Sequence, residues 1–160
     1  MFIKPDYIVE KLEDINYNEL KEKGKKVLLF DLDSTVMPSK SGNYLPKTKE
    51  LLENLKKDFT VAIISNNSNE QYIRKVRSIS NFAVISNAKK PDTKVLMEYL
   101  TRTGKTADVA VMIGDRPLTD ILCGKFAGMT TVLVDSITKD TEGKEVRFVR
   151  WLERLTVKKA

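Results

Sequence analysis

A chain of 160 residues, 41% hydrophobic and 31% charged, is long enough for one domain with a buried core and has the composition of a soluble globular protein. Its apolar runs are far shorter than a membrane-spanning helix. The absence of histidine and the presence of only one cysteine exclude histidine-based nucleophile systems and an internal disulfide. The formal net charge of +6 favours anionic partners.

The N-terminal region is predicted to be helical. Residues 6–23 have the pattern of short helical pieces that end near Gly24, and the following run KVLLF is typical of a strand buried on both faces. The opening stretch MFIKPDYIVEKLEDI contains Pro5 and several acids instead of the continuous apolar segment of a secretory signal. We therefore expect a cytoplasmic protein.

Helix and strand patterns alternate along the next part of the chain. Helices are predicted at 45–59, 69–80, 93–104 and 118–128, and further strands at 60–65, 82–86, 108–113 and 130–135. About five strands joined by helices predict right-handed crossovers and a parallel sheet covered on both faces. The expected fold class is therefore α/β, a three-layer α/β/α sandwich with a Rossmann-like sheet.

Polar residues follow most of the predicted strands, at the edge of the sheet where such folds bind ligands. They are Asp31 and Asp33, Ser65 and Asn66, Lys90, and Asp115 and Asp120. Carboxylates bind hard divalent cations such as Mg2+, whereas lysine and hydroxyl groups bind phosphoryl oxygens. Each motif alone is also common in turns and helix caps, but together they predict a metal and phosphate site.

Without histidine, a carboxylate can serve as the nucleophile. Asp31, at the tip of the first predicted strand, is the candidate. Asp33 points the same way in an extended chain, so it can act as general acid and then as general base. A cation between Asp31 and Asp115 would keep the nucleophile ionised and would screen an anionic substrate.

The same residues resemble the four motifs of the haloacid dehalogenase-like (HAD) superfamily over residues 27 to about 134. The matching stretches are DLDST, Ser65 after VAII, Lys90 in KKP, and GDRPLTD. Within the superfamily the chain is similar to subfamily IIIA and to the YqeG-type phosphatases, which share FIKPD, SNN and NAKKP. The second acid of DLDST separates it from dehalogenases and from P-type ATPases.

This resemblance implies a Mg2+-dependent phosphatase that works through an aspartyl-phosphate intermediate. Asp31 would be the nucleophile and Asp33 the acid/base, with Ser65, Asn66 and Lys90 at the phosphate. The implied metal ligands are Asp31, Asp33 through its backbone carbonyl, Asp115 and Asp120. At position 116 the relatives usually carry a neutral residue, whereas this chain has Arg116. This arginine is either a solvated surface charge or a contact to an anionic substrate.

HAD enzymes often select their substrates with an inserted cap domain, and this chain has no room for one. An uncapped, HAD-like site favours a large substrate such as a lipid head group, a protein or a polymer end. We expect one hydrolase domain over residues 1–160: an N-terminal helical segment (1–24), a catalytic core (25–135) and a C-terminal basic amphipathic helix (136–160).

On that C-terminal helix, basic and apolar residues separate onto two faces. The basic face holds Arg147, Arg150, Arg154 and Lys158, and the apolar face holds Phe148, Leu152 and Leu155. The favoured interpretation packs the apolar face on the sheet and leaves the basic face in water. The alternative is peripheral contact with an anionic membrane, apolar side inward.

The first functional hypothesis is dephosphorylation of phosphatidylglycerophosphate to phosphatidylglycerol, because YqeG-type relatives include phosphatases of that lipid. A second is a phosphatase for a small sugar phosphate, a nucleotide or a phosphoprotein. A third, from another class, is a non-catalytic regulatory or ribonucleoprotein-binding module, which only the basic charge supports. Nucleic acid is not an expected partner, Cys123 is predicted to be a buried thiol, and the oligomeric state is not predicted.

Overall fold

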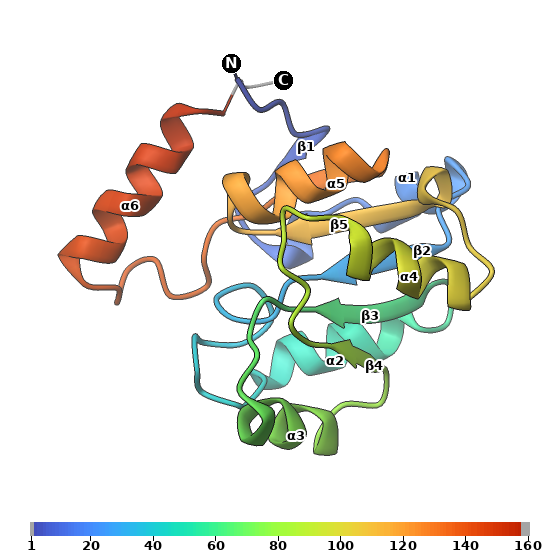
Figure 1. Cartoon of the computed structure of the whole chain (residues 1–160), viewed down its shortest axis with the longest axis horizontal. Helices are drawn as coiled ribbons and strands as arrows, with labels where there is room; N and C mark the ends of the chain where they lie inside the picture. Colours follow the sequence, from blue (N-terminus) through green and yellow to red (C-terminus); the bar gives the residue numbers. More distant parts are fainter. Residues whose placement is uncertain (1, 158–160) are drawn as a thin grey trace.

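A parallel sheet with helices on both faces forms the centre of the molecule in the computed structural model, which describes residues 2–157 (Figure 1). Within these residues the sheet has six strands, in the order β1-β6-β5-β2-β3-β4. The strands are β1 (Tyr7–Ile8), β2 (Val27–Phe30), β3 (Thr60–Ile64), β4 (Ala83–Ile85), β5 (Ala110–Gly114) and β6 (Thr130–Leu133). The helices are α1 (Tyr17–Glu22), α2 (Pro46–Leu55), α3 (Glu70–Ser78), α4 (Lys94–Arg102), α5 (Leu122–Ala127) and α6 (Lys144–Leu155). Short helical turns lie at Leu12–Asp14, Ala107–Val109 and Pro117–Ile121.

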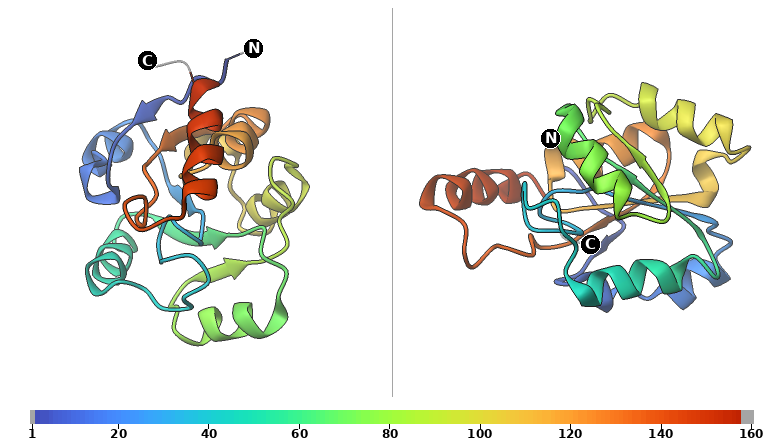
Figure 2. Two further views of the ribbon diagram at one scale, coloured as in Figure 1. Left: turned by 90° about the vertical axis from the view of Figure 1, so that its left-hand side faces the viewer. Right: turned by 90° about the horizontal axis from the view of Figure 1, so that it is seen from below.

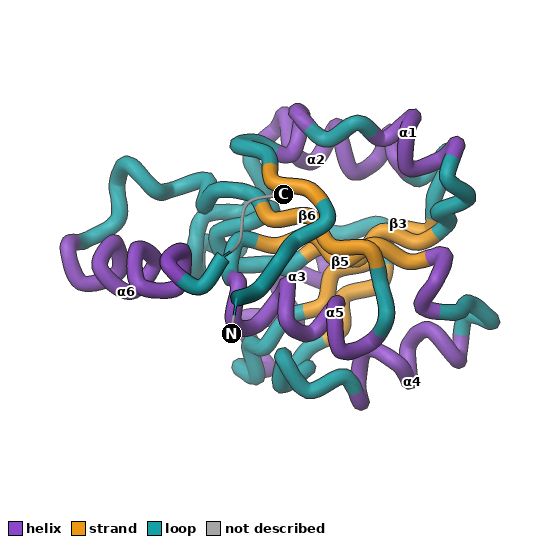
Figure 3. The backbone as a smooth tube through the Cα atoms, turned by 90° about the horizontal axis from the view of Figure 1, so that it is seen from above, coloured by secondary structure: helices purple, strands orange, loops and turns teal. Residues whose placement is uncertain are grey.

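The central strand β2 explains why its sequence is a continuous apolar run. Leu28 and Phe30 pack into one hydrophobic cluster with α1 and α2, whereas Val27 and Leu29 pack into another with α4 and α5. Figure 3 shows these helix pairs on opposite sides of the sheet. A strand covered on both faces needs apolar residues at every position, and this strand delivers the next residue, Asp31, to the carboxyl edge of the sheet.

The predicted α/β/α sandwich is confirmed, with one strand more than predicted. Residues Tyr7 and Ile8, assigned to a helical segment, form the short edge strand β1 and pair in parallel with Val132 and Leu133. Only the later part of that segment is helical. Its helix α1 ends at Glu22, close to the predicted end near Gly24.

Within residues 2–157, the expected lack of a cap is confirmed by the connections at the carboxyl edge. The chain between β2 and β3 holds a loop and α2, and the chain between β3 and β4 holds α3. Helix α6 stands apart from the sandwich, off the carboxyl ends of the central strands (Figures 1 and 2). Among the described residues, no helix has the length and apolar character to cross a bilayer.

Candidate active site

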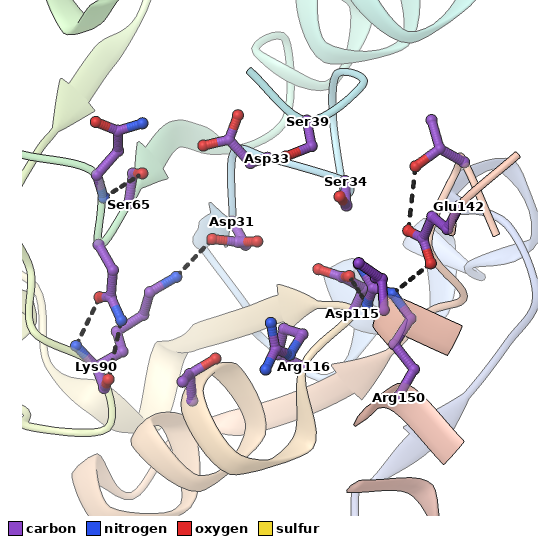
Figure 4. A pocket seen from close by; sticks show the side chains of 15 residues that line it. Asp31, Asp33, Ser34, Ser39, Ser65, Lys90, Asp115, Arg116, Glu142 and Arg150 are labelled. Atoms are coloured by element: carbon purple, nitrogen blue, oxygen red, sulfur yellow. Dashed lines mark hydrogen bonds and ion pairs between the residues drawn. The ribbon is translucent and has the colours of Figure 1, made fainter. Parts of the chain in front are cut away.

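A cavity of about 400 Å3 opens at the carboxyl ends of β2, β3 and β5 (Figure 4). It brings together most of the residues predicted from the strand ends. These are Asp31, Asp33, Ser65, Asn66, Lys90 and Asp115. The remaining predicted residue, Asp120, is buried and bonded to Lys90. The cavity is completed by Ser34, Ser39, Asn67, Arg116, Thr119, Thr138, Glu142, Val146 and Arg150.

Lys90 is the buried cation of this site. Its Nζ donates to Asp31 Oδ1 and to Asp120 Oδ1, both at 2.7 Å, and to the backbone carbonyl oxygen of Ile64 at 2.8 Å. Burial alone would lower the pKa of Lys90, but the carboxylates of Asp120 and Asp31 raise it overall. The lysine is therefore an ammonium group fixed beside the nucleophile candidate.

Asp115 lies beside Asp31 on the other side of the site. Thr35 Oγ1 donates to Asp115 Oδ1 at 2.8 Å and is 3.3 Å from Asp31 Oδ2, so it ties the two loops together. Arg150 donates to the second carboxylate oxygen of Asp115. Burial and the charge of Asp31 nevertheless raise the pKa of Asp115 to about 6, and the same two causes raise the pKa of Asp120 to about 7.

A divalent cation fits the acidic cluster. One carboxylate oxygen from each of Asp31, Asp115 and Asp120 lies within 4.8 Å of the other two. Such a set of hard oxygen donors is what Mg2+ and similar ions bind. Gly114 makes room for the cluster, because a Cβ at this position would clash with the Asp120 carboxylate.

Asp33 lies apart from this cluster and is held differently. Strand β2 ends at Phe30 and the chain turns at Ser34, whose φ is +68°, so strand alternation does not set the direction of Asp33. Its Oδ1 accepts hydrogen bonds from Tyr72 Oη at 2.6 Å and from the backbone N–H of Lys40 at 2.8 Å. The two acids of DLDST therefore occupy distinct environments at one cavity.

Asn66 supports the site through the backbone of Lys90. Its Oδ1 accepts from the Lys90 N–H at 2.7 Å, and its Nδ2 donates to the Lys90 carbonyl oxygen at 2.9 Å. Ser65 is buried at the end of β3, and its Oγ accepts from the Asn67 N–H at 3.0 Å. Both residues line the predicted phosphate side of the cavity.

Tyr72 and Glu142 were not predicted from the sequence to be site residues. Arg150 was predicted to lie on the solvent-facing basic side of the C-terminal helix, whereas it lines the cavity. Tyr72 sits in the first turn of α3, where the Asn69 side chain accepts its N–H at 3.0 Å, and helical spacing does not reveal its contact with Asp33. Glu142 accepts from Arg150 Nε at 2.7 Å and so holds that arginine over the cavity. A glutamate in a polar loop gives no sequence signal for this contact.

The favoured interpretation of the C-terminal helix is wrong, because α6 faces the core with its basic side. Arg150 reaches Asp115, and Arg154 Nη2 donates to the backbone carbonyl oxygen of Val134 at 2.7 Å. Ion pairs and hydrogen bonds outweigh apolar packing here. The opposite side, which we call the α6 apolar face, is exposed. It comprises Phe148, Val149, Trp151, Leu152 and Leu155, whereas Val146, which is also exposed, lines the cavity. Lys158, assigned to the basic side, lies outside the described residues.

Arg116 is not simply a solvated charge. Its Nε donates to Glu153 Oε2 on α6 at 2.7 Å, while its side chain lines the cavity and remains 41% exposed. The buried carboxylate of Glu153 thus fixes Arg116 at the edge of the site.

The fold and the carboxylate cluster at the ends of β2 and β5 place the chain in the class of HAD-type phosphoric monoester hydrolases. A HAD phosphatase from Thermococcus onnurineus has a similar fold, with a TM-score of 0.59 and 18% identity, over 74% of this chain and 88% of that one. YrbI, a phosphatase from Haemophilus influenzae whose structure is of the cobalt-bound form, has a TM-score of 0.54 and 15% identity. The match covers 87% of this chain and 78% of that one.

The chain belongs to the mitochondrial PGP phosphatase family, whose sequence profile matches residues 1–138. It is 30% identical to the probable phosphatase YqeG of Bacillus subtilis over 96% of this chain and 88% of that protein. It is also 29% identical to phosphatidylglycerophosphate phosphatase 1, chloroplastic/mitochondrial, of Arabidopsis thaliana. The match covers 99% of this chain and 48% of the plant protein, so this chain spans about half of that relative.

Proposed function

We propose that this phosphatase is Mg2+-dependent and converts phosphatidylglycerophosphate to phosphatidylglycerol through an aspartyl-phosphate intermediate. The observation that carries the chemistry is the position of Asp31. Its Oδ1 accepts from Lys90 Nζ at 2.7 Å, its Oδ2 lies 3.3 Å from Thr35 Oγ1, and one of the two oxygens belongs to the cluster with Asp115 and Asp120. A carboxylate oriented in this way would hold a metal ion through one oxygen and attack phosphorus in line with the other.

In the first step the Asp31 oxygen bonds to phosphorus while the bond to the leaving alcohol oxygen breaks. Asp33 gives its proton to that oxygen, and Lys90 and Ser65 hold the phosphoryl oxygens. In the second step Asp33 takes a proton from water, whose oxygen attacks the phosphorus and releases inorganic phosphate. Asp31 is then regenerated as a free carboxylate. The hydrogen bond from Tyr72 Oη to Asp33 Oδ1 would fix the orientation of this carboxylate in both steps.

Asp31, Asp115 and Asp120 would hold Mg2+ in this mechanism. The ion supplies positive charge that keeps the carboxylates ionised and offsets the negative charge of the phosphoryl group. The proposal that the metal is magnesium rests on the all-oxygen donor set of the cluster.

The lipid substrate is supported by the name of the plant relative and by the α6 apolar face. Phe148 and Trp151 lie on this face with their rings stacked 6.0 Å apart and are 58% and 56% exposed. Aromatic and aliphatic side chains on a surface helix insert into the boundary between head groups and acyl chains. Since Val146 and Arg150 of the same helix line the cavity, such contact would bring the site to a lipid head group.

Phosphate release in the presence of Mg2+ tests the catalytic proposal. The substrates are phosphatidylglycerophosphate in vesicles, soluble sugar phosphates, nucleotides and phosphopeptides, with Asp31→Asn as the inactive control. The fastest turnover is expected on the vesicles. If a soluble substrate is turned over faster than the vesicles, the substrate of this enzyme belongs to that soluble class and is not the lipid. No release from any substrate would support the non-catalytic module instead.

Vesicle binding tests the membrane contact independently of turnover. Trp151 is the single tryptophan of the chain, so its fluorescence reports on α6 alone. Its emission should shift to the blue with vesicles containing anionic lipid, and Phe148→Ser should weaken binding. Phe126→Ser is the matched control, because Phe126 lies on α5 and is 63% exposed. Equal loss of binding in both variants would exclude a specific role of the α6 apolar face.

A further inference from the structure

We infer that Arg116 is a specificity residue of this site, whose guanidinium binds a second phosphate group of the substrate. The inference rests on the proposed phosphatase function. It assigns a phosphodiester, located a few bonds from the phosphomonoester that is cleaved, as the group that Arg116 binds.

Three cationic side chains line the cavity among the described residues, and their surroundings differ. Lys90 is 1% exposed and is bound to two carboxylates. Arg150 is 17% exposed and is also bound to two, Asp115 and Glu142. Arg116 is 41% exposed and contacts one carboxylate, Glu153, through Nε. It therefore has the greatest capacity to donate further hydrogen bonds to an anion.

The ion pair with Glu153 orients Arg116. Glu153 is 5% exposed and belongs to α6, and it accepts from Nε, the atom on one edge of the planar guanidinium. The terminal Nη1 and Nη2 atoms can then present paired N–H groups, an arrangement suited to two oxygens of a phosphate. Because this orientation is fixed before binding, less conformational entropy is lost when an anion arrives.

The cavity is large enough for more than the reacting phosphoryl group. Its volume of about 400 Å3 falls in the range of pockets that take whole small ligands. Its lining also includes the hydroxyl residues Ser39, Thr119 and Thr138, and these groups, like Arg116, can bind phosphate oxygens. Figure 4 shows Arg116 apart from Ser65, on the other side of Asp31.

Two soluble substrates separate this role from a purely structural one. The first is glycerophosphoglycerophosphate, the deacylated head group, which carries a phosphodiester and a phosphomonoester. The second is glycerol phosphate, which carries the monoester alone. Arg116→Gln should raise the KM for the first about 10-fold, and leave the KM for the second within about twofold. For Arg116→Lys the KM for the first substrate should lie between those of the wild-type chain and Arg116→Gln, since lysine keeps the charge but loses the paired donors.

A binding measurement supplies a readout without turnover. Titration calorimetry of glycerophosphoglycerol, which has the phosphodiester but no cleavable monoester, should show weaker binding to Arg116→Gln than to the wild-type chain. Arg74→Gln is the control, because Arg74 is an exposed arginine on α3 and its loss changes the net charge equally. Trp151 fluorescence shows whether α6 keeps its place in each variant.

The outcomes distinguish the inference from the function on which it rests. Equal changes in KM for both soluble substrates, or no change for either, would overturn the second phosphate site while leaving the phosphatase intact. If the wild-type chain released phosphate from neither soluble substrate nor phosphatidylglycerophosphate vesicles, the proposed function itself would fall. A wild-type chain that hydrolysed both soluble substrates with the same KM would also overturn the inference.

Discussion

The ammonium nitrogen of Lys90 lies 2.7 Å from a carboxylate oxygen of Asp120, and each side chain is 1% exposed. The two residues are 30 positions apart, with Lys90 in the loop after β4 and Asp120 in the helical turn after β5. They meet because the Lys90 side chain reaches the end of β3, where Nζ donates to the carbonyl oxygen of Ile64, and β3 and β5 both flank β2. Asp31 accepts a further hydrogen bond from the same nitrogen. A buried cation thus joins the predicted phosphate side of the site to the predicted metal side.

Replacing Lys90 by methionine should destabilise the fold strongly. The change leaves Asp31 and Asp120 without their shared cation, and breaking a buried ion pair costs about 3–5 kcal/mol of the free energy of unfolding. Thermal unfolding without divalent cations should show a melting temperature lower by about 10 °C. Adding Asp120→Asn to the variant should restore part of the loss, because it removes one uncompensated charge. A double variant less stable than Lys90→Met would contradict this account.

Gly114→Ala should impair the acidic cluster more than the fold. A Cβ at this last residue of β5 clashes with the Asp120 carboxylate, which must move away from Asp31 and Asp115. We expect at least about a tenfold loss of phosphatase activity and a higher Mg2+ concentration for half-maximal rate, with about 1–3 kcal/mol lost from the free energy of unfolding. Gly143→Ala is the control, because nothing lies within 4 Å of its added Cβ. Similar kinetics in the two variants would refute the prediction.

The features that could be predicted from the sequence are those that depend on neighbours in the chain. The run VLLF must be a strand buried on both faces, and the parallel topology then collects Asp31, Ser65, Lys90 and Asp115 at one edge. Strand β1 escaped prediction because two residues are too few to show alternation, and its position depends on pairing with β6.

The orientation of α6 could not be predicted for a different reason. An amphipathic pattern divides a helix into two faces, but it does not say which face meets the protein. Usually the apolar face is the one that packs on the protein. In α6 the basic face does so instead, because Arg150 forms ion pairs with Asp115 and Glu142. These partners lie 35 and 8 positions away, on separate loops, so only the tertiary structure reveals them.

Tyr72→Phe should slow the chemical step with little effect on substrate binding. The change removes the 2.6 Å hydrogen bond that orients the Asp33 carboxylate. We expect kcat to fall about 10-fold with KM within about twofold, since general acid/base catalysis depends on geometry. Tyr44→Phe removes a similar bond, 2.7 Å from Tyr44 Oη to Ser80 Oγ, between residues that do not line the cavity. It should cost about 1 kcal/mol of stability and leave kcat unchanged. Equal kcat values in the two variants would refute the role of Tyr72.

The thiol of Cys123 should be unreactive in the native protein. The residue is fully buried among α4, α5 and the sheet, and burial raises its pKa to about 11. Because the thiolate forms only as pH rises toward that value, about one thiol in a thousand is ionised at pH 8. A colourimetric disulfide reagent at pH 8 should label the native chain at least about a hundredfold more slowly than the chain unfolded in urea. Cys123→Ala should retain phosphatase activity, because the thiol has no part in the proposed reaction. Rapid native labelling, or loss of activity in a folded Cys123→Ala chain, would place Cys123 in the site instead of the core.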